Sequence, residues 1–182
     1  MSQLFHHRLL LDEAQGFVRK YHRHSKPLKR HVFSIGASDR RDPYYEPLGI
    51  VTVDRCSSAW SKRRDHIEIR RVCVRPAGDW PDGLDAGRYN VASFLIGKAK
   101  QACFAMGYRC ITTYTQPHET GASLKAAGFF IHKMQARATT DGQISGRVLW
   151  VALSNEQPDQ RDRDFTNSCL VKLADFQEEY GQ

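Results

Sequence analysis

The stretch 66–130 most constrains the fold, because strand and helix signals alternate within it. It opens with HIEIRRVCV (66–74), in which apolar and charged residues alternate as in a strand. A loop rich in Pro, Gly and Asp follows, and apolar residues then recur at steps of three and four over 88–107, which predicts a helix. A second strand is predicted at 109–117 and a short helix within 119–130.

A strand, a turn, a helix and a second strand in this order predict a βαβ unit with two parallel strands. The positive N-terminus of its helix can bind an anion such as pyrophosphate. The residues expected at that terminus are Arg88, Tyr89, Asn90, Val91, Ala92 and Ser93. The spacing alone also allows an ordinary crossover helix without a ligand.

The flanking segments predict a mixed sheet. Helices are expected at 8–20 and 169–181, and strands at 31–38, 47–54, 130–138 and 146–154. Asp141-Gly142 predicts a hairpin between the last two strands. The fold class expected is therefore α/β, with a mixed β-sheet flanked by helices and a C-terminal helical extension.

Size and composition favour one globular domain, expected at 1–155, followed by a polar linker and helix at 156–182. The last helix is expected to dock on the body or on a partner, and a homodimer is one such arrangement. No apolar run is long enough for a membrane span, so a cytoplasmic location is expected. The five cysteines are odd in number and form no CxxC, which favours neither disulfides nor a metal site.

The net charge of +7 favours contact with polyanions, although it also serves solubility. Basic residues concentrate in 22–31 and 55–66, the second around Trp60. Either segment can be a nucleic-acid contact or a solvated basic loop. The candidate DNA-binding residues are Arg23, Lys26, Lys62, Arg63 and Arg64.

Several short segments resemble the GNAT acyltransferases. They are YNVASFLI (89–96), TYTQ (113–116) and GASLKAAGF (121–129), with YHRHSKP (21–27) near the start. The glycine pattern of ordinary members is not intact, since YNVAS follows Arg88. The segments look more like the GNAT-related Mom-like DNA modification proteins of phages and mobile elements.

The resemblance implies a donor, acetyl-CoA or a related acyl-CoA, bound by the loop and helix start after the first strand. Besides residues 88–93, Cys73 and Val74 would line that donor site. It also raises a functional role for His24 and Ser25 and implies DNA as a partner.

Catalytic candidates follow from the expected crevice where the two parallel strands part. Glu68 can serve as the base and Tyr114 as the acid of an acyl transfer, and both can instead be structural. Glu119 and Ser123 are the reserve candidates.

Three functions stay open at this point. The first is acyl transfer to a nucleobase amine in DNA, and the second is acyl transfer to a small amine or a protein. The third is a nucleic-acid-binding module that keeps the fold without catalysis.

Overall fold

A computed structural model describes residues 3–21, 28–41, 46–57, 64–80, 90–138, 144–154 and 160–180. The strands are β1 (Phe5–Leu9), β2 (Phe33–Ser38), β3 (Gly49–Asp54), β4 (His66–Val74), β5 (Cys110–Thr115), β6 (Phe130–Ala138) and β7 (Ile144–Leu153). The helices are α1 (Leu11–Tyr21), α2 (Val91–Ala105), α3 (Ala122–Ala126) and α4 (Gln160–Tyr180), with a short 3-10 helix, η2 (Ala77–Asp79).

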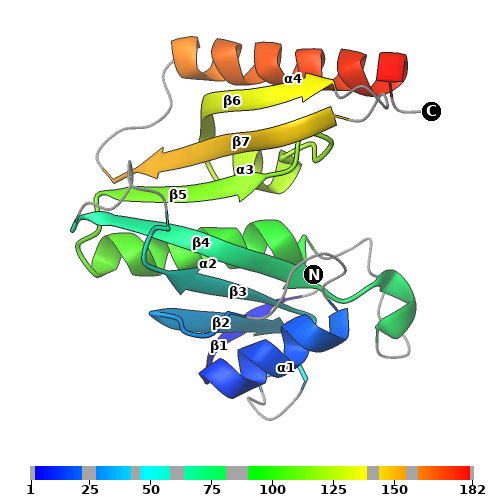
Figure 1. Ribbon diagram of the computed structural model, residues 1–182. Helices are drawn as coiled ribbons and strands as arrows, with labels where there is room; N and C mark the ends of the chain where they lie inside the picture. The colour runs from blue at the N-terminus through cyan, green and yellow to red at the C-terminus, as the bar shows by residue number, and fades with distance from the viewer. Residues whose placement is uncertain are drawn as a thin grey trace.

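The strands form one sheet in the order β1-β2-β3-β4-β5-β7-β6. Among the described strands, β4 and β5 pair in parallel, and the other neighbours are antiparallel. Helix α1 covers one face of the sheet and α2 with α3 the other, while α4 lies along β6 (Figure 1). The predicted α/β fold with a mixed sheet and a C-terminal helix is confirmed.

The main core lies between the sheet and α2. One side of α2 is buried against the sheet along the whole helix. Val91, Leu95 and Ala99 of α2 are buried there against strand residues such as Ile67 and Ile111. This side of the sheet is called the α2 face. The opposite side, called the α1 face, has a smaller cluster in which Phe17 and Val18 of α1 pack on Ile50 and Cys73.

The predicted helix 8–20 is wrong at its start, because residues 5–9 form β1. The run Leu9–Leu11 fits either element by its apolar character, but Leu9 pairs with Ser34 of β2 and is buried. Pairing with a distant strand decides the assignment, and local sequence does not report it.

The C-terminal helix begins earlier than the expected 169, at Gln160. Its polar first turns have a tertiary anchor, since Thr166 Oγ1 accepts a hydrogen bond from the backbone N–H of Ile131 at 3.0 Å. Cys169 and Leu173 then bury themselves in the main core. The expected domain boundary at 155 and the turn at Asp141-Gly142 lie outside the described residues.

Candidate functional site

Strands β4 and β5 pair over a short length and then diverge (Figure 1). Their register runs from His66 opposite Cys110 to Glu68 opposite Thr112. Beyond it, the Thr113 hydroxyl still donates to the Ile69 carbonyl at 3.0 Å. We call the divergence after the Glu68–Thr112 pair the fork. It is the point where the only parallel pair of this described sheet separates, which is where α/β sheets bind ligands.

A β-bulge in β4 directly follows the parallel pairing. Thr52 of β3 pairs with Arg71 and the next residue, Val53, pairs with Ile69, so Arg70 is an extra residue in β4. A bulge bends its strand and increases the local twist. The bend therefore coincides with the fork and turns the second half of β4 away from β5.

The N-terminus of α2 lies close to the end of β4. A Cβ built on Gly49, the β3 partner of Val74, would lie 2.8 Å from Val91 Cγ1 and 3.0 Å from the Cys73 carbonyl oxygen. The first distance is shorter than a real Cβ contact and the second is unusually tight, so a glycine at 49 permits the close approach of α2. The sequence signal for this contact is one glycine at a strand start.

Asn90, the residue before α2, makes no side-chain capping hydrogen bond at the N-terminus of this helix. Phe94 N–H donates a hydrogen bond to the Asn90 carbonyl at 2.9 Å in the first turn. The backbone N–H groups of residues 91–93 come before this first hydrogen bond, so they have no carbonyl partner within the helix. The buried Ser93 Oγ has no hydrogen-bond partner among the described residues. The terminus can thus accept an anionic ligand.

The structure gathers most of the predicted donor residues at this place. Cys73, Val74, Asn90, Val91, Ala92 and Ser93 lie at the end of β4 and the start of α2. Burial raises the pKa of the Cys73 thiol to about 11, so that side chain stays a neutral core group on the α1 face. Arg88 and Tyr89 lie outside the described residues.

Glu68 is 5% exposed and has three hydrogen-bond donors around its carboxylate. The backbone N–H and the hydroxyl of Ser57 donate to Oε2 at 3.0 and 3.2 Å, and Arg70 Nη1 donates to Oε1 at 3.0 Å. Sequence reasoning missed Ser57, because its contact crosses from the segment after β3.

Tyr114 lies on β5 beyond the last parallel pair, opposite Leu149 of β7. It is half-buried and packs on an apolar cluster of the α1 face, which comprises Cys110, Phe130, Leu149 and Val151. Its hydroxyl makes no hydrogen bond to the part of the chain that the structure describes. The phenol is therefore a candidate to contact a ligand at the fork. The reserve candidate Glu119 accepts a hydrogen bond from Gln116 N–H at 2.6 Å, and Ser123 is half-buried on α3.

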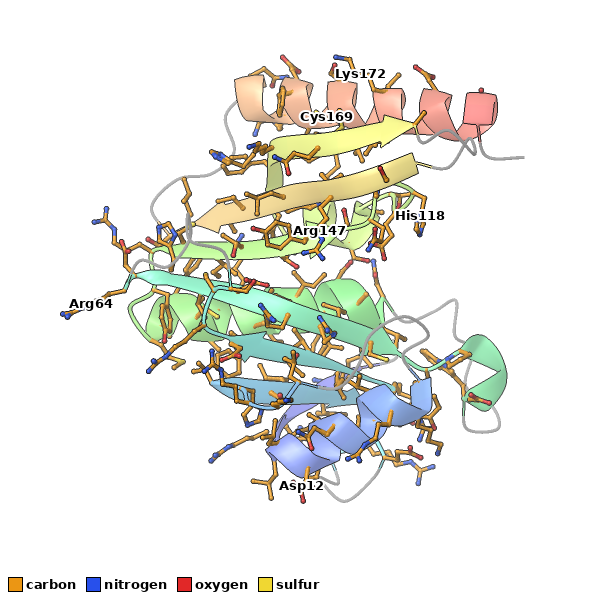
Figure 2. The ribbon with its side chains drawn as sticks, in the orientation of Figure 1. Asp12, Arg64, His118, Arg147, Cys169 and Lys172 are labelled. Atoms are coloured by element: carbon orange, nitrogen blue, oxygen red, sulfur yellow. The ribbon has the colours of Figure 1, made fainter. Side chains whose placement is uncertain are left out.

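The remaining predicted residues are not brought together. His24, Ser25, Arg23, Lys26, Lys62 and Arg63 lie outside the described residues. Arg64 is exposed at the N-terminal end of β4 and extends away from the body (Figure 2). That end is opposite to the end that meets α2.

A cluster of charged residues that the sequence did not predict lies beside the end of β4, next to the candidate donor site. Glu46 accepts hydrogen bonds at 3.1 Å from both Tyr21 and Lys20 and forms an ion pair with the buried Arg75. Burial raises the pKa of the Glu46 carboxyl, but Lys20, Arg75 and Tyr21 together bring it below its usual value. The cluster joins the end of α1 to the residue that follows β4.

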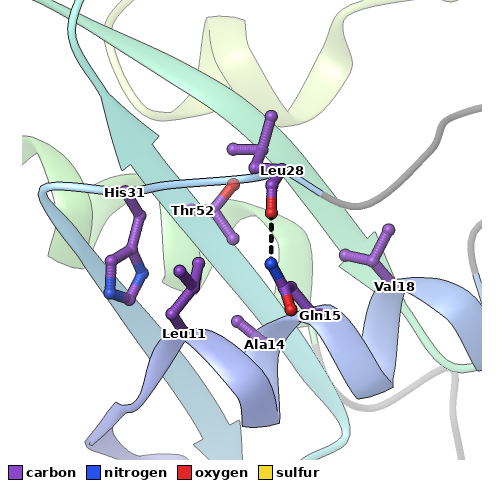
Figure 3. A pocket seen from close by; sticks show the side chains of 7 residues that line it. All are labelled: Leu11, Ala14, Gln15, Val18, Leu28, His31 and Thr52. Carbon is purple, nitrogen blue, oxygen red and sulfur yellow. Dashed lines mark hydrogen bonds between the residues drawn. The ribbon is translucent and has the colours of Figure 1, made fainter.

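A small hollow lies between α1 and β3 on the α1 face (Figure 3). Leu28 lines it and accepts a hydrogen bond from Gln15 Nε2 at 2.6 Å. His31 also lines it, and burial lowers the pKa of that imidazole. Residue 28 is the first described residue after the predicted His24 and Ser25.

In the described ranges, no three His, Cys, Asp or Glu side chains lie together in a way that could hold a metal ion. All five cysteines are buried and free. No described helix combines the length and apolar character that crossing a membrane requires.

No protein-family model matches the sequence, and comparison with curated proteins finds no match. Solved structures do match. An IAA acetyltransferase from Bacillus cereus is 11% identical with a TM-score of 0.55, and the match covers 83% of this chain and 99% of that one. An acetyltransferase of Bacillus subtilis in complex with CoA is 13% identical with a TM-score of 0.57, covering 83% and 99%.

Aminoglycoside 6'-acetyltransferase type Ii is 10% identical with a TM-score of 0.58, covering 85% of this chain and 99% of that one. Identities at this level establish the fold alone, but the matches cover nearly all of each known chain. The chain thus has the fold of solved acetyltransferases, and the matched structures from Desulfovibrio desulfuricans and Streptococcus pneumoniae are described as members of the GNAT family.

Proposed function

We propose that this protein transfers an acyl group from an acyl-CoA to an amine. One observation carries the proposal, namely the N-terminus of α2, which the Asn90 side chain does not cap, close to the end of β4. Backbone N–H groups at a helix N-terminus favour a pyrophosphate, and in this proposal the extended part of the donor lies along β4 where it diverges from β5. In this proposal residues 90–93 bind the pyrophosphate and Arg88 contributes its charge.

The reaction forms a bond from the acceptor nitrogen to the acyl carbon and breaks the bond from that carbon to sulfur. The nitrogen loses a proton to a base, and the departing thiolate takes one from an acid. Tyr114 is the proposed acid, since its hydroxyl makes no hydrogen bond to a described residue. Glu68 is the proposed base, with the qualification that its donors Ser57 and Arg70 must share the carboxylate with the acceptor.

The proposed acceptor is a nucleobase amine in DNA. The net charge of +7 and the resemblance to Mom-like proteins support this choice over a small amine or a protein. Such an amine is a weak nucleophile, so the site has to position it closely, with His24 and Ser25 on the acceptor side. A base within a duplex must also leave the stack to reach the fork.

Two measurements test the proposal. Acetyl-CoA at millimolar concentration should raise the melting temperature by mass action, and Arg88→Glu should abolish the rise, while Lys172→Gln on the far side of α4 should leave it unchanged. Mass spectrometry of nucleosides from host DNA, with and without expression, should reveal an acylated base.

An unchanged melting temperature in the wild type would overturn the donor site and favour a non-catalytic binding module. Donor binding without any modified nucleoside would move the acceptor to small amines or proteins.

A further inference from the structure

Arg70 has more hydrogen-bond donors than the described residues satisfy. It is the extra residue of the β4 bulge, and its side chain is 23% exposed. Nη1 donates to Glu68 Oε1 at 3.0 Å, but Nε is buried and has no hydrogen-bond partner among the described residues. A planar guanidinium carries five N–H donors, so the Arg70 guanidinium retains donors that no described residue uses.

Glu68 accepts one hydrogen bond from Arg70 and has no second oxygen free to accept another from the same guanidinium. Its other oxygen, Oε2, already accepts from the N–H and the hydroxyl of Ser57. An unsatisfied buried donor on a charged group is unfavourable, and an additional acceptor beside Arg70 would remove that cost.

A second guanidinium lies on the same face. Ile69 and Val72 both pack in the main core on the α2 face, so the bulge directs Arg70 and Arg71 together toward the α1 face. Burial, and then the charge of Arg70, lower the pKa of Arg71, while the charge of Glu68 raises it. The two guanidiniums and the Glu68 carboxylate together carry one net positive charge at the bulge.

The carboxylates on this part of the α1 face are already engaged. Asp54 lies opposite Glu68 and accepts from Arg30 Nε at 3.3 Å and from the Arg55 N–H at 2.8 Å. Among the described strand residues of this face, Glu68 and Asp54 are the acids. Neither carboxylate has both oxygens free to pair with the Arg70 guanidinium.

Beyond the fork, the face becomes apolar and then basic again. Tyr114 of β5 lies opposite Leu149 of β7, and the exposed Lys133 of β6 lies opposite Leu149 on its other side. The exposed Arg147 is two residues from Leu149 along β7 (Figure 2). An apolar floor between cationic residues suits a molecule with an apolar or aromatic body and a negative group.

We infer that the acceptor carries an anionic group besides its amine, namely a phosphate in the proposed DNA acceptor or a carboxylate in the alternative small-amine acceptor. Arg70 binds this anionic group while the acceptor body lies over Tyr114. The inference rests on the proposed acyl transfer for its orientation toward the fork. A carboxylate or a phosphate can accept two parallel hydrogen bonds from the planar guanidinium of arginine, which lysine cannot reproduce.

The test measures binding by calorimetry to the whole chain, with two matched ligand pairs. Phenylalanine is compared with phenethylamine, and deoxyadenosine monophosphate with deoxyadenosine. The anionic member of at least one pair should bind roughly tenfold or more tightly, as expected for charge-assisted hydrogen bonds. The pair with the larger preference identifies whether a carboxylate or a phosphate is the natural group.

Three variants accompany the wild type. Arg70→Gln should abolish the preference. Arg70→Lys keeps a cation beside Glu68, and so preserves folding, but should lose most of the preference. Lys172→Gln removes an exposed charge that points away from the sheet on α4 and should change nothing (Figure 2).

Equal binding within both pairs in the wild type would overturn the inference, as would a full preference in a folded Arg70 variant. Donor binding is measured separately by the acetyl-CoA melting shift. An anion preference without that shift would leave the Arg70 site standing and reject the acyl transfer, whereas the shift without a preference would do the reverse.

Discussion

Arg71 Nη1 donates a hydrogen bond to the carbonyl oxygen of its neighbour Arg70, with a donor–acceptor distance of 2.6 Å. Arg70 is the extra residue of the bulge, and a bulge disrupts the regular ladder around it. A side chain therefore satisfies a backbone group where the ladder is interrupted. Since the bulge follows directly on the last parallel pair of β4 and β5, this contact helps to hold the fork in its shape.

Replacing Gly49 should loosen the donor end of the site. In Gly49→Ala the new methyl group would meet Val91 Cγ1 at 2.8 Å and the Cys73 carbonyl at 3.0 Å, so α2 has to move away from β4. Unfolding in urea should show a loss of about 1–3 kcal/mol, the usual cost of overpacking, and the acetyl-CoA melting shift should shrink. Gly97→Ala in the same helix has nothing within 4 Å and should be neutral or stabilising. Equal behaviour of the two variants would contradict the close approach of α2.

Tyr114→Phe should lower kcat at least about tenfold, because the thiolate loses its proposed proton donor. Acetyl-CoA binding should stay nearly unchanged, since the hydroxyl makes no hydrogen bond to the described residues and is not needed for folding. Tyr108→Phe, at a half-buried tyrosine packed against the main core, is the control. Full activity in Tyr114→Phe would shift the search to Glu119 and Ser123.

The Glu46 cluster predicts a specific loss of stability in acid. Its carboxyl has a lowered pKa in the folded protein, because Lys20, Arg75 and Tyr21 outweigh the opposite effect of burial. The contribution to stability is present above the unfolded value, about 4.3, and is lost as the pH falls through the folded pKa. Glu46→Gln should therefore unfold at lower urea than the wild type at pH 7, and the difference should shrink between about pH 5 and pH 3. Glu178→Gln, at an exposed carboxylate on α4, should show no such trend.

Thr166 tests the attachment of α4 to the sheet. Its Oγ1 accepts the Ile131 N–H at 3.0 Å in a buried setting. Thr166→Val keeps the shape and leaves that N–H without its acceptor, which should cost roughly 1–3 kcal/mol in urea unfolding. Thr166→Ser retains the hydroxyl and should keep most of that energy. If both variants lose the same amount, the methyl group rather than the hydrogen bond holds α4.

The periodic segments of this chain were determined by sequence alone. β4 at 66–74 and β6 at 130–138 have the predicted limits, and the helix predicted at 88–107 is observed as α2 at 91–105. Alternation and helical spacing report which side of an element is buried, and that information is local. From these elements and their order the mixed sheet and its parallel pair could be predicted.

Tertiary structure alone decided the features that make the site. The assignment of Leu9 to a strand depends on its partner Ser34, and the helical start at Gln160 depends on an anchor at Ile131. The extra residue Arg70 in β4 leaves the alternation of its neighbours intact enough to escape notice, because a bulge is defined by the partner strand. The charges of Arg70, Arg71 and Glu68 are visible in the sequence, but which of their hydrogen bonds are satisfied depends on groups brought from other parts of the chain.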